Sequence, residues 1–503
     1  MKSNIGHQQF TKISIFTFIV YFIAAICGHF NFLAAWFFNR HYFPLKSYLI
    51  TFNDSKITNI ENISKSIYNL AGYKALINTN IPYKLIDDLF FVFISSSLII
   101  LFFLGYKIVQ SNTISHGAII KWAVLFSVLM TVSIPSHSSD LFGYIARGAQ
   151  QSIYHQNPYL ETVDNIKDYR FNRMLCNFSW PHQPTTYGPV FIFITKAIVY
   201  LSNNNFLISF INFKLLNLTL YFLLILFVSK LNQTKDLFLI AWNPLILIQG
   251  LWNCHNDLVS GVFIFLGIYM LLKSKNNNKY FWSIFSLVFA FGIKYVSALI
   301  ISVIMFYFLQ KRTDAKVFVN LLLGFCSGLL LVLIFSMDYL ISFRDLSISS
   351  SNELISNLDL VHQSLIAAVF TVIKYICNLS NLQFNPDKLQ FILKSSFYIT
   401  FLVFYFWILF KKKTNLIFEI TLVLFIFIAF TLAKFHSWYL LNLIVLIPFL
   451  QPCFLKNILI ALSLSHVYAL TFLDQAKILN FVSMTMLPVL FMFFKEKRKE
   501  GSL

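Results

Sequence analysis

A short polar segment in the first third of the chain carries the residues best suited to chemistry. In SHSSDLFGYIARG, Asp140, Tyr144 and Arg147 are spaced so that they share one face of a helix. A carboxylate held on that face could remove a proton from a hydroxyl group as a general base. The alternative is that Ser138, Ser139 and Asp140 only cap the first turn of the helix.

Other polar groups interrupt or end apolar runs further along the chain. Lys294 lies within a long apolar run, and a charge deep in a bilayer costs about 2.5 to 3.5 kcal/mol on insertion scales. Lys294 is therefore either functional or a lysine whose flexible stem reaches the membrane surface. Asn256 and Asp257 fit either a site or a polar turn, and His436–Tyr439 fits either a site or an interfacial aromatic belt.

The composition of the chain requires a lipid environment for these polar groups. Of 503 residues 58% are apolar and 12% are charged, with 59 Phe, and the mean hydropathy is +0.70. Too little polar surface is available to cover a soluble core. Repeated apolar runs, several of about 20 residues, predict an all-α polytopic transmembrane helical bundle, not a barrel, in one domain over 1–503. The six cysteines have neither metal-ligand nor disulfide-framework spacing.

About fourteen spans are predicted from the apolar runs. They lie near 13–35, 88–106, 119–135, 206–229, 236–252, 256–272, 280–293, 294–310, 317–336, 390–410, 415–433, 437–452, 456–473 and 476–494. The apolar segments 190–201 and 365–375 are predicted to be interfacial or re-entrant helices, because further spans there would invert the topology.

The basic residues indicate which side of the membrane each connection faces. The net charge of +19 comes from small clusters at the ends of apolar runs, which argues against a nucleic-acid partner. Alternate short connections hold an excess of Lys and Arg and are predicted to be cytoplasmic. Three longer connections, about 36–87, 136–205 and 337–389, then face outward, and the candidate residues converge at that outer surface.

Short motifs follow one another along the chain. After Asp140 and Tyr144 come Asn157-Pro158-Tyr159, Tyr187-Gly188-Pro189, Asn243-Pro244, His255-Asn256-Asp257, Gly292-Ile293-Lys294 and His436-Ser437-Trp438-Tyr439. The order of these motifs resembles that of polyprenyl-phosphate-mannose-dependent mannosyltransferases of the GT-C superfamily, and it is most similar to the bacterial alpha-1,6-mannosyltransferases of lipomannan assembly. Each motif is short, so the resemblance depends on the whole set.

The resemblance implies a role for each candidate residue. Asp140 would be the general base of an inverting transfer of a hexose, with mannose the expected sugar. The donor phosphate would be bound by Arg147, Lys294, Lys434 and His436. Sugar or acceptor contacts would come from Tyr144, Asn157, Tyr159, Tyr187, His255, Asn256, Asp257, Trp438 and Tyr439.

A lipid-linked donor fits the sequence better than a nucleotide sugar. No P-loop or dinucleotide fingerprint occurs, and the candidate residues are predicted to face away from the cytosol. The expected partners are a polyprenyl-phosphate sugar, a lipid-linked or cell-envelope glycan acceptor and the bilayer. The expected location is the bacterial inner membrane with a periplasmic site, and the endoplasmic reticulum is the less favoured alternative.

Three questions stay open at this level. Metal use is undecided, because Asp140, His255 and Asp257 could meet around a divalent ion. A flippase or transporter of lipid-linked sugars would also be polytopic, although such proteins tend to show repeated halves and ionisable groups near the midplane. A polysaccharide ligase is the third alternative.

Overall fold

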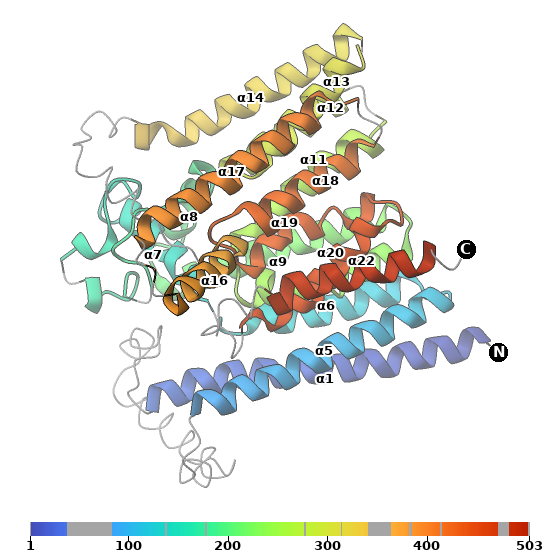
Figure 1. Cartoon of the computed structure of the whole chain (residues 1–503). Coiled ribbons are helices and arrows are strands. Elements are labelled where there is room, and N and C mark those ends of the chain that lie inside the picture. The colour runs from blue at the N-terminus through green and yellow to red at the C-terminus, as the bar shows by residue number, and fades with distance from the viewer. Residues whose placement is uncertain are drawn as a thin grey trace.

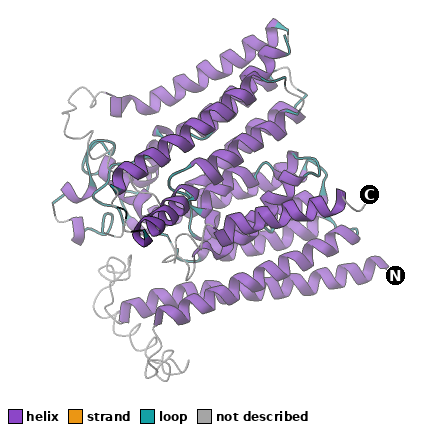
Figure 2. Cartoon of the chain, viewed as in Figure 1, coloured by secondary structure: helices purple, strands orange, loops and turns teal. Residues whose placement is uncertain are grey.

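The computed structural model confirms the all-helical prediction. It describes residues 2–37, 83–340, 364–470 and 482–500, with short gaps at 136–137, 168, 177–178, 276–277, 313, 381, 383–384 and 413–414. These residues form helices and no strand (Figure 2). Most of the predicted outer loop 36–87, the middle of 337–389 and the ends of the spans predicted at 456–473 and 476–494 lie outside the described residues.

Among the described residues, six helices are long and apolar enough to cross a membrane, which indicates an integral membrane protein. They are α1 (Lys2–Phe37), α5 (Tyr83–Ser111), α9 (Phe206–Ser229), α11 (Asn256–Lys273), α14 (Ala315–Leu340) and α17 (Pro386–Phe410).

Shorter or interrupted helices correspond to the other predicted spans. They are α6 (His116–Val132), α10 (Thr234–Ala241) with η3 (Ile246–Trp252), α12 (Lys279–Ile293), α13 (Ser297–Gln310), and α18 (Leu416–Ile426) with η5 (Phe427–Thr431). The last three groups are η6 (Ser437–Leu440), α19 (Leu441–Ile444) and η7 (Ile447–Phe449); α20 (Phe454–Ser465) with η8 (His466–Leu470); and η10 (Val482–Met486) with α22 (Leu487–Glu500).

The break between α10 and η3 follows from its sequence. Pro244 has no backbone N–H and cannot continue the hydrogen-bond ladder. The Asn243 side chain stabilises the break: it accepts a hydrogen bond from the Leu245 N–H at 3.0 Å and donates one to the Ser463 hydroxyl at 3.0 Å. The predicted span 236–252 is therefore two short helices joined at a polar hinge.

The elements outside the spans gather at one end of the bundle. In Figure 1 both chain termini lie at one end of the helices, and α7 (Asp140–Ser152) and α8 (Pro189–Leu201) lie at the opposite end. The short turns η1 (Val163–Asn165) and η2 (Tyr169–Phe171) lie between α7 and α8 in the chain. The second segment predicted to be interfacial forms α16 (Leu365–Leu379).

Glycines let α7, α8 and α12 approach one another closely. A Cβ atom on Gly148 of α7 would come within 2.4 Å of the Thr195 carbonyl oxygen of α8. A Cβ atom on Gly188 would come within 2.3 Å of the Gly292 carbonyl oxygen of α12. The Gly188 N–H also donates to the Ile293 carbonyl at 3.1 Å. These contacts bring the start of α8 against the end of α12, directly before Lys294.

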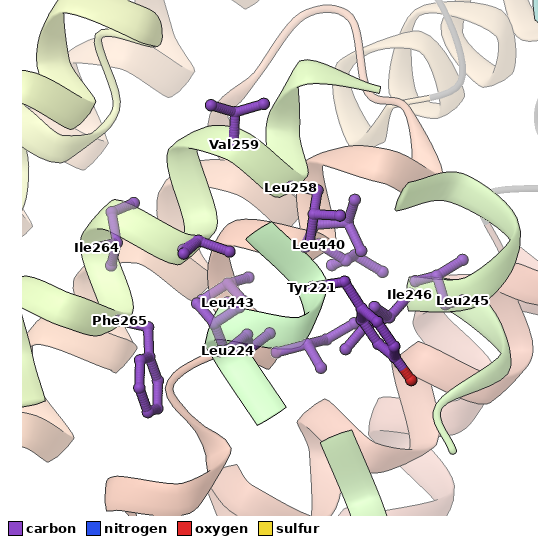
Figure 3. Packing of buried hydrophobic residues seen from close by; sticks show 14 of the residues in the cluster. Tyr221, Leu224, Leu245, Ile246, Leu258, Val259, Ile264, Phe265, Leu440 and Leu443 are labelled. Atoms are coloured by element: carbon purple, nitrogen blue, oxygen red, sulfur yellow. The ribbon is translucent and has the colours of Figure 1, made fainter. Parts of the chain in front are cut away.

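The apolar core lies among the helices, between the end with α7 and α8 and the end with the termini. Lipid is as apolar as the side chains, so helix association in a membrane depends on close packing rather than on exclusion of water. Figure 3 shows buried residues from four segments: Tyr221 and Leu224 of α9, Leu245 and Ile246 at η3, Leu258, Val259, Ile264 and Phe265 of α11, and Leu440 and Leu443.

The other end of the bundle, where the termini lie, contains a cavity of about 1180 Å³. It is lined by residues at the starts of α10, α18 and α20 and at the ends of α5 and α11. Lys456 of α20 contacts Asp236 of α10 there at 2.8 Å.

Candidate functional site

Asp140 and His255 form the centre of the candidate site. Asp140 is the first residue of α7, and its Oδ2 lies 3.0 Å from His255 Nδ1. The Asp140 side chain is 19% exposed, whereas His255 is fully buried behind it. Because its carboxylate contacts a residue 115 positions away, capping of α7 does not account for Asp140.

Nearby positive groups lower the pKa of Asp140. Burial alone would raise this pKa, but the hydrogen bond and charge of His255 and the charges of His436 and Lys294 outweigh it. The carboxylate is therefore ionised near neutral pH. Since an ionised carboxylate only accepts hydrogen bonds, we assign the hydrogen to Nδ1 of His255.

Two residues of α9 position the segment that carries His255. Lys214, 3% exposed, donates to the carbonyls of Ser133, Leu251 and Trp252 at 2.9, 2.9 and 2.6 Å. Asn217 donates to the carbonyl of Gly250 at 2.8 Å and to that of His255 at 3.3 Å. Sequence reasoning missed both residues, although a lysine inside the apolar run 206–229 was a detectable signal.

Asp257 and Lys294 form a buried ion pair beside this centre. The Lys294 Nζ contacts Asp257 Oδ1, and the Asp257 side chain is fully buried while that of Lys294 is 22% exposed. Asn442 donates to the same oxygen at 2.9 Å. The ammonium also lies 4.2 Å from the centre of the Tyr439 ring, within cation–π range. Asn442 is a further residue that sequence reasoning did not find.

The aromatic segment at 436–439 packs against His255. The Trp438 ring stacks on the rings of both His255 and His436, with 3.9 Å between the ring centroids in the first pair and 4.3 Å in the second. Tyr439 meets the edge of His436 at 5.4 Å. This segment therefore belongs to the same cluster as Asp140, although nearly 300 residues separate them.

Tyr144 connects α7 to the start of α11. Its hydroxyl accepts a bond from the Asn256 N–H at 3.1 Å and lies 3.4 Å from Asn256 Oδ1. Its ring meets that of Tyr187 at 5.4 Å. Burial raises the pKa of both tyrosines, so each hydroxyl keeps its proton.

Lys434 lies at the same end, half-buried and 5.0 Å from the centre of the Trp180 ring. Burial lowers the pKa of Lys434, and the charge of Asp140 partly offsets this effect. Lys434 is therefore close enough to be influenced by the carboxylate.

Three predicted residues are held by other contacts. Arg147, 2% exposed, donates to Gln150 at 2.8 Å and to the Gln183 carbonyl, and burial lowers its pKa to about 10. Asn157 donates to the Tyr339 carbonyl at 3.2 Å and accepts from the Tyr159 N–H at 3.0 Å.

The Tyr159 hydroxyl in turn donates to the Tyr187 carbonyl at 2.8 Å. Arg147, Asn157 and Tyr159 thus order the connection between α7 and α8.

The described part of the chain contains no group of three His, Cys, Asp or Glu residues arranged to hold a metal ion. Of the three residues that the sequence suggested for a divalent ion, Asp140 and His255 contact each other directly. Asp257 instead contacts Lys294 and Asn442.

Several buried polar atoms in this cluster lack a hydrogen-bond partner among the described residues. They are Asn253 Oδ1, His255 Nε2, Asn256 Nδ2, Asp257 Oδ2 and Asn442 Oδ1. Leaving a buried polar group unsatisfied costs about 1–3 kcal/mol. Such a concentration of unsatisfied groups is unusual for a packing core and is typical of functional sites.

Slightly less than half of the chain is similar to a known family. Residues 75–310 match the model for the alpha-(1->6)-mannopyranosyltransferase family, N-terminal domain. The matched region includes Asp140, His255, Asp257 and Lys294 and ends before the aromatic segment. No curated protein and no solved structure matches the chain.

Proposed function

We propose that this chain is a glycosyltransferase, similar over residues 75–310 to the alpha-(1->6)-mannopyranosyltransferase family, and that it moves mannose from a polyprenyl-phosphate donor to a glycan hydroxyl with inversion. One observation carries the proposal. The partly exposed Asp140 carboxylate hydrogen-bonds to His255 and lies within the influence of Lys294, Lys434 and His436. A base beside several cations suits the attack of a hydroxyl group on a sugar phosphate.

The reaction is a single displacement. The acceptor oxygen forms a bond to the anomeric carbon while the bond from that carbon to the phosphate oxygen breaks. The phosphate keeps the electron pair, and the acceptor proton goes to Asp140, whose Oδ1 is left available by the His255 contact at Oδ2. Attack from the face opposite the leaving group inverts the configuration, so an alpha product requires a beta-linked donor.

The cations have the task of stabilising the charge of the departing phosphate. The positive charges of Lys294 and His436 lower the pKa of Asp140, and the negative charge of Asp140 raises the pKa of Lys434. Arg147 is left out of this set because it is 2% exposed and donates to Gln150 and the Gln183 carbonyl. We assign it the role of ordering the connection that follows α7.

The sugar is proposed to lie against the aromatic side of the cluster. Trp438 and Tyr439 are half-buried beside His436, and sugar rings commonly pack on such faces. Tyr144 and Asn256 are buried, and half-buried Tyr187 packs against Tyr144; these three residues are assigned to shaping the floor of the site.

The membrane supplies the setting for a lipid-linked donor. The candidate site and the chain termini lie at opposite ends of the helices (Figure 1). Lysines such as Lys235, Lys273 and Lys456 line the cavity at the end with the termini. Under the positive-inside rule that end is cytoplasmic. The proposed location is therefore a bacterial inner membrane with a periplasmic site, where the acceptor is a lipid-linked or cell-envelope glycan.

A transfer assay on two forms of the chain tests the proposal. Membranes containing the native chain or Asp140→Asn at equal abundance receive labelled polyprenyl-phosphate mannose and lipid acceptors. We expect the native chain to transfer mannose and the variant to be slower by about 10² to 10⁴, the usual contribution of a positioned general base.

Two outcomes would contradict this proposal. Equal transfer by both forms would remove Asp140 as the base. If neither form transfers mannose but the native chain moves the intact donor across vesicles, the chain is instead a transporter.

A further inference from the structure

Lys294 contacts one carboxylate and lies within electrostatic range of a second one, which has different surroundings. Its ammonium contacts Asp257 Oδ1, and its charge also lowers the pKa of Asp140. Asp140 reaches the surface with 19% of its side chain exposed, whereas Asp257 is fully buried. Lys294 therefore pairs with Asp257 and acts electrostatically on Asp140, and of the two carboxylates only Asp140 is exposed to an acceptor from the surface.

We propose that Asp257 is a positioning residue that holds the Lys294 ammonium away from Asp140, so that the Asp140 carboxylate stays available as the base. This inference rests on the role proposed for Asp140. It gives Asp257 a task other than direct contact with the sugar. Buried ion pairs add little net stability, so a function for the pair has to come from its position.

The contacts around Asp257 suit such a task. Its Oδ1 receives the Lys294 ammonium and the Asn442 amide at 2.9 Å, which together fix the orientation of the carboxylate. The Tyr439 ring, 4.2 Å from the ammonium, covers another side of the lysine. At the other end of the side chain, the contact between Gly188 and Gly292 fixes the backbone just before Lys294.

Loss of the Asp257 charge would release the lysine toward the remaining carboxylate. Direct pairing with Lys294 would lower the pKa of Asp140 further and weaken it as a base. The titratable and charged groups that face Asp140 come from every element packed around it. They are His255, His436, Lys294, Lys434, Tyr144, Tyr187, Tyr439 and Asp257.

The protonation of Asp140 can be followed without any substrate. A water-soluble carbodiimide modifies protonated carboxyl groups, and peptide mass spectrometry of the full chain in detergent gives the pH midpoint for Asp140. In Asp257→Asn we expect that midpoint to fall by roughly one to three pH units, the usual effect of a close opposite charge. In the double variant with Lys294→Gln the fall should disappear, because no ammonium is left to pair with Asp140.

Asp236→Asn is the matched control. Asp236 also pairs with a lysine, Lys456, at 2.8 Å, but beside the cavity at the opposite end of the bundle. Its loss should leave the Asp140 midpoint unchanged. Size-exclusion chromatography selects the folded fraction of each variant before labelling.

The single variant Lys294→Gln keeps the test decisive if Asp257→Asn does not fold. It should raise the Asp140 midpoint, because a nearby positive charge is lost, and an unchanged midpoint would overturn the inference. An unchanged midpoint in Asp257→Asn, or an equal fall with and without Lys294, would overturn it too. The labelling needs no mannosyl transfer, so failure of the proposed function would be seen separately in the transfer assay.

Discussion

Two buried Lys–Asp pairs lie at opposite ends of the bundle and differ in their neighbours. Lys294 pairs with Asp257 at the candidate site, and Lys456 pairs with Asp236 beside the cavity at the other end. Both aspartates lie in the first turn of a helix, α11 and α10 respectively, where a negative charge is favourable.

The difference lies in what surrounds each lysine. Lys456 donates its second bond to the Leu450 carbonyl at 2.9 Å, so the pair ties α10 to the start of α20. Lys294 instead meets the Tyr439 ring and acts on the charge of Asp140. A buried ion pair is thus not evidence of function by itself, because a second carboxylate nearby is what distinguishes the candidate site.

Neutralising the two lysines one at a time gives the largest expected contrast. Lys294→Gln should lower the rate of mannosyl transfer by about 10² to 10³, the usual effect of losing one group that stabilises developing negative charge. Lys456→Gln should leave transfer per folded molecule unchanged. The measurement is transfer from labelled donor, normalised to the monodisperse fraction of each variant. Similar losses from both lysines would show that packing, not phosphate contact, explains the effect.

His255 offers a smaller contrast with a second buried histidine. His255→Phe retains a ring to stack on Trp438 but loses the hydrogen bond to Asp140. Bonds to charged groups contribute about 1.5–3 kcal/mol, so transfer should fall roughly ten- to a hundredfold. The bond stabilises the ionised carboxylate, so its loss raises the pKa of Asp140 and moves the acid limb of the pH–rate profile to higher pH.

The control for this change is His466→Phe. His466 is 3% exposed, bonds to Thr485 at 3.1 Å and packs on the Phe435 ring at 5.1 Å. It should alter thermal stability without moving the acid limb. If the acid limb of the pH–rate profile shifts in both variants, loss of the His255–Asp140 hydrogen bond does not explain the shift.

Much of the fold could be predicted from the sequence because the bilayer limits the choices. A long apolar run in lipid has to satisfy its backbone internally, and helices do so. Gathering of Asp140, His255, Asp257 and Lys294 also followed from alternating spans, since residues at the same ends of helices share one side of a membrane.

The contacts within the site could not be predicted in the same way. Spacing places Asp140 and Arg147 on one face of α7 but says nothing about what packs against it, and Arg147 meets a carbonyl of the distant residue Gln183. Asn442 and Asn217 lie in apolar segments where an amide gives little signal. Their partners depend on how helices remote in sequence dock, which periodicity does not encode.

Close backbone packing between the start of α8 and the end of α12 positions Lys294. Substitutions at two glycines, Gly188 and Gly117, test this role. A methyl group on Gly188 would meet the Gly292 carbonyl oxygen at 2.3 Å, a backbone atom that cannot turn aside. In Gly188→Ala the start of α8 has to move from α12, at a cost of about 1–3 kcal/mol for overpacking. Because Lys294 follows Gly292 by two residues, a several-fold loss of mannosyl transfer should accompany the fall in thermal stability.

Gly117→Ala is the comparison at the other end, near the start of α6, where nothing lies within 4 Å of the added atom. Alanine favours helix over glycine by up to about 1 kcal/mol, so this variant should be as stable as the native chain or more so, with full transfer. Thermal unfolding in detergent and the transfer assay measure both effects. If Gly188→Ala lost stability but kept full transfer, the α8–α12 contact would support the fold without aiming Lys294.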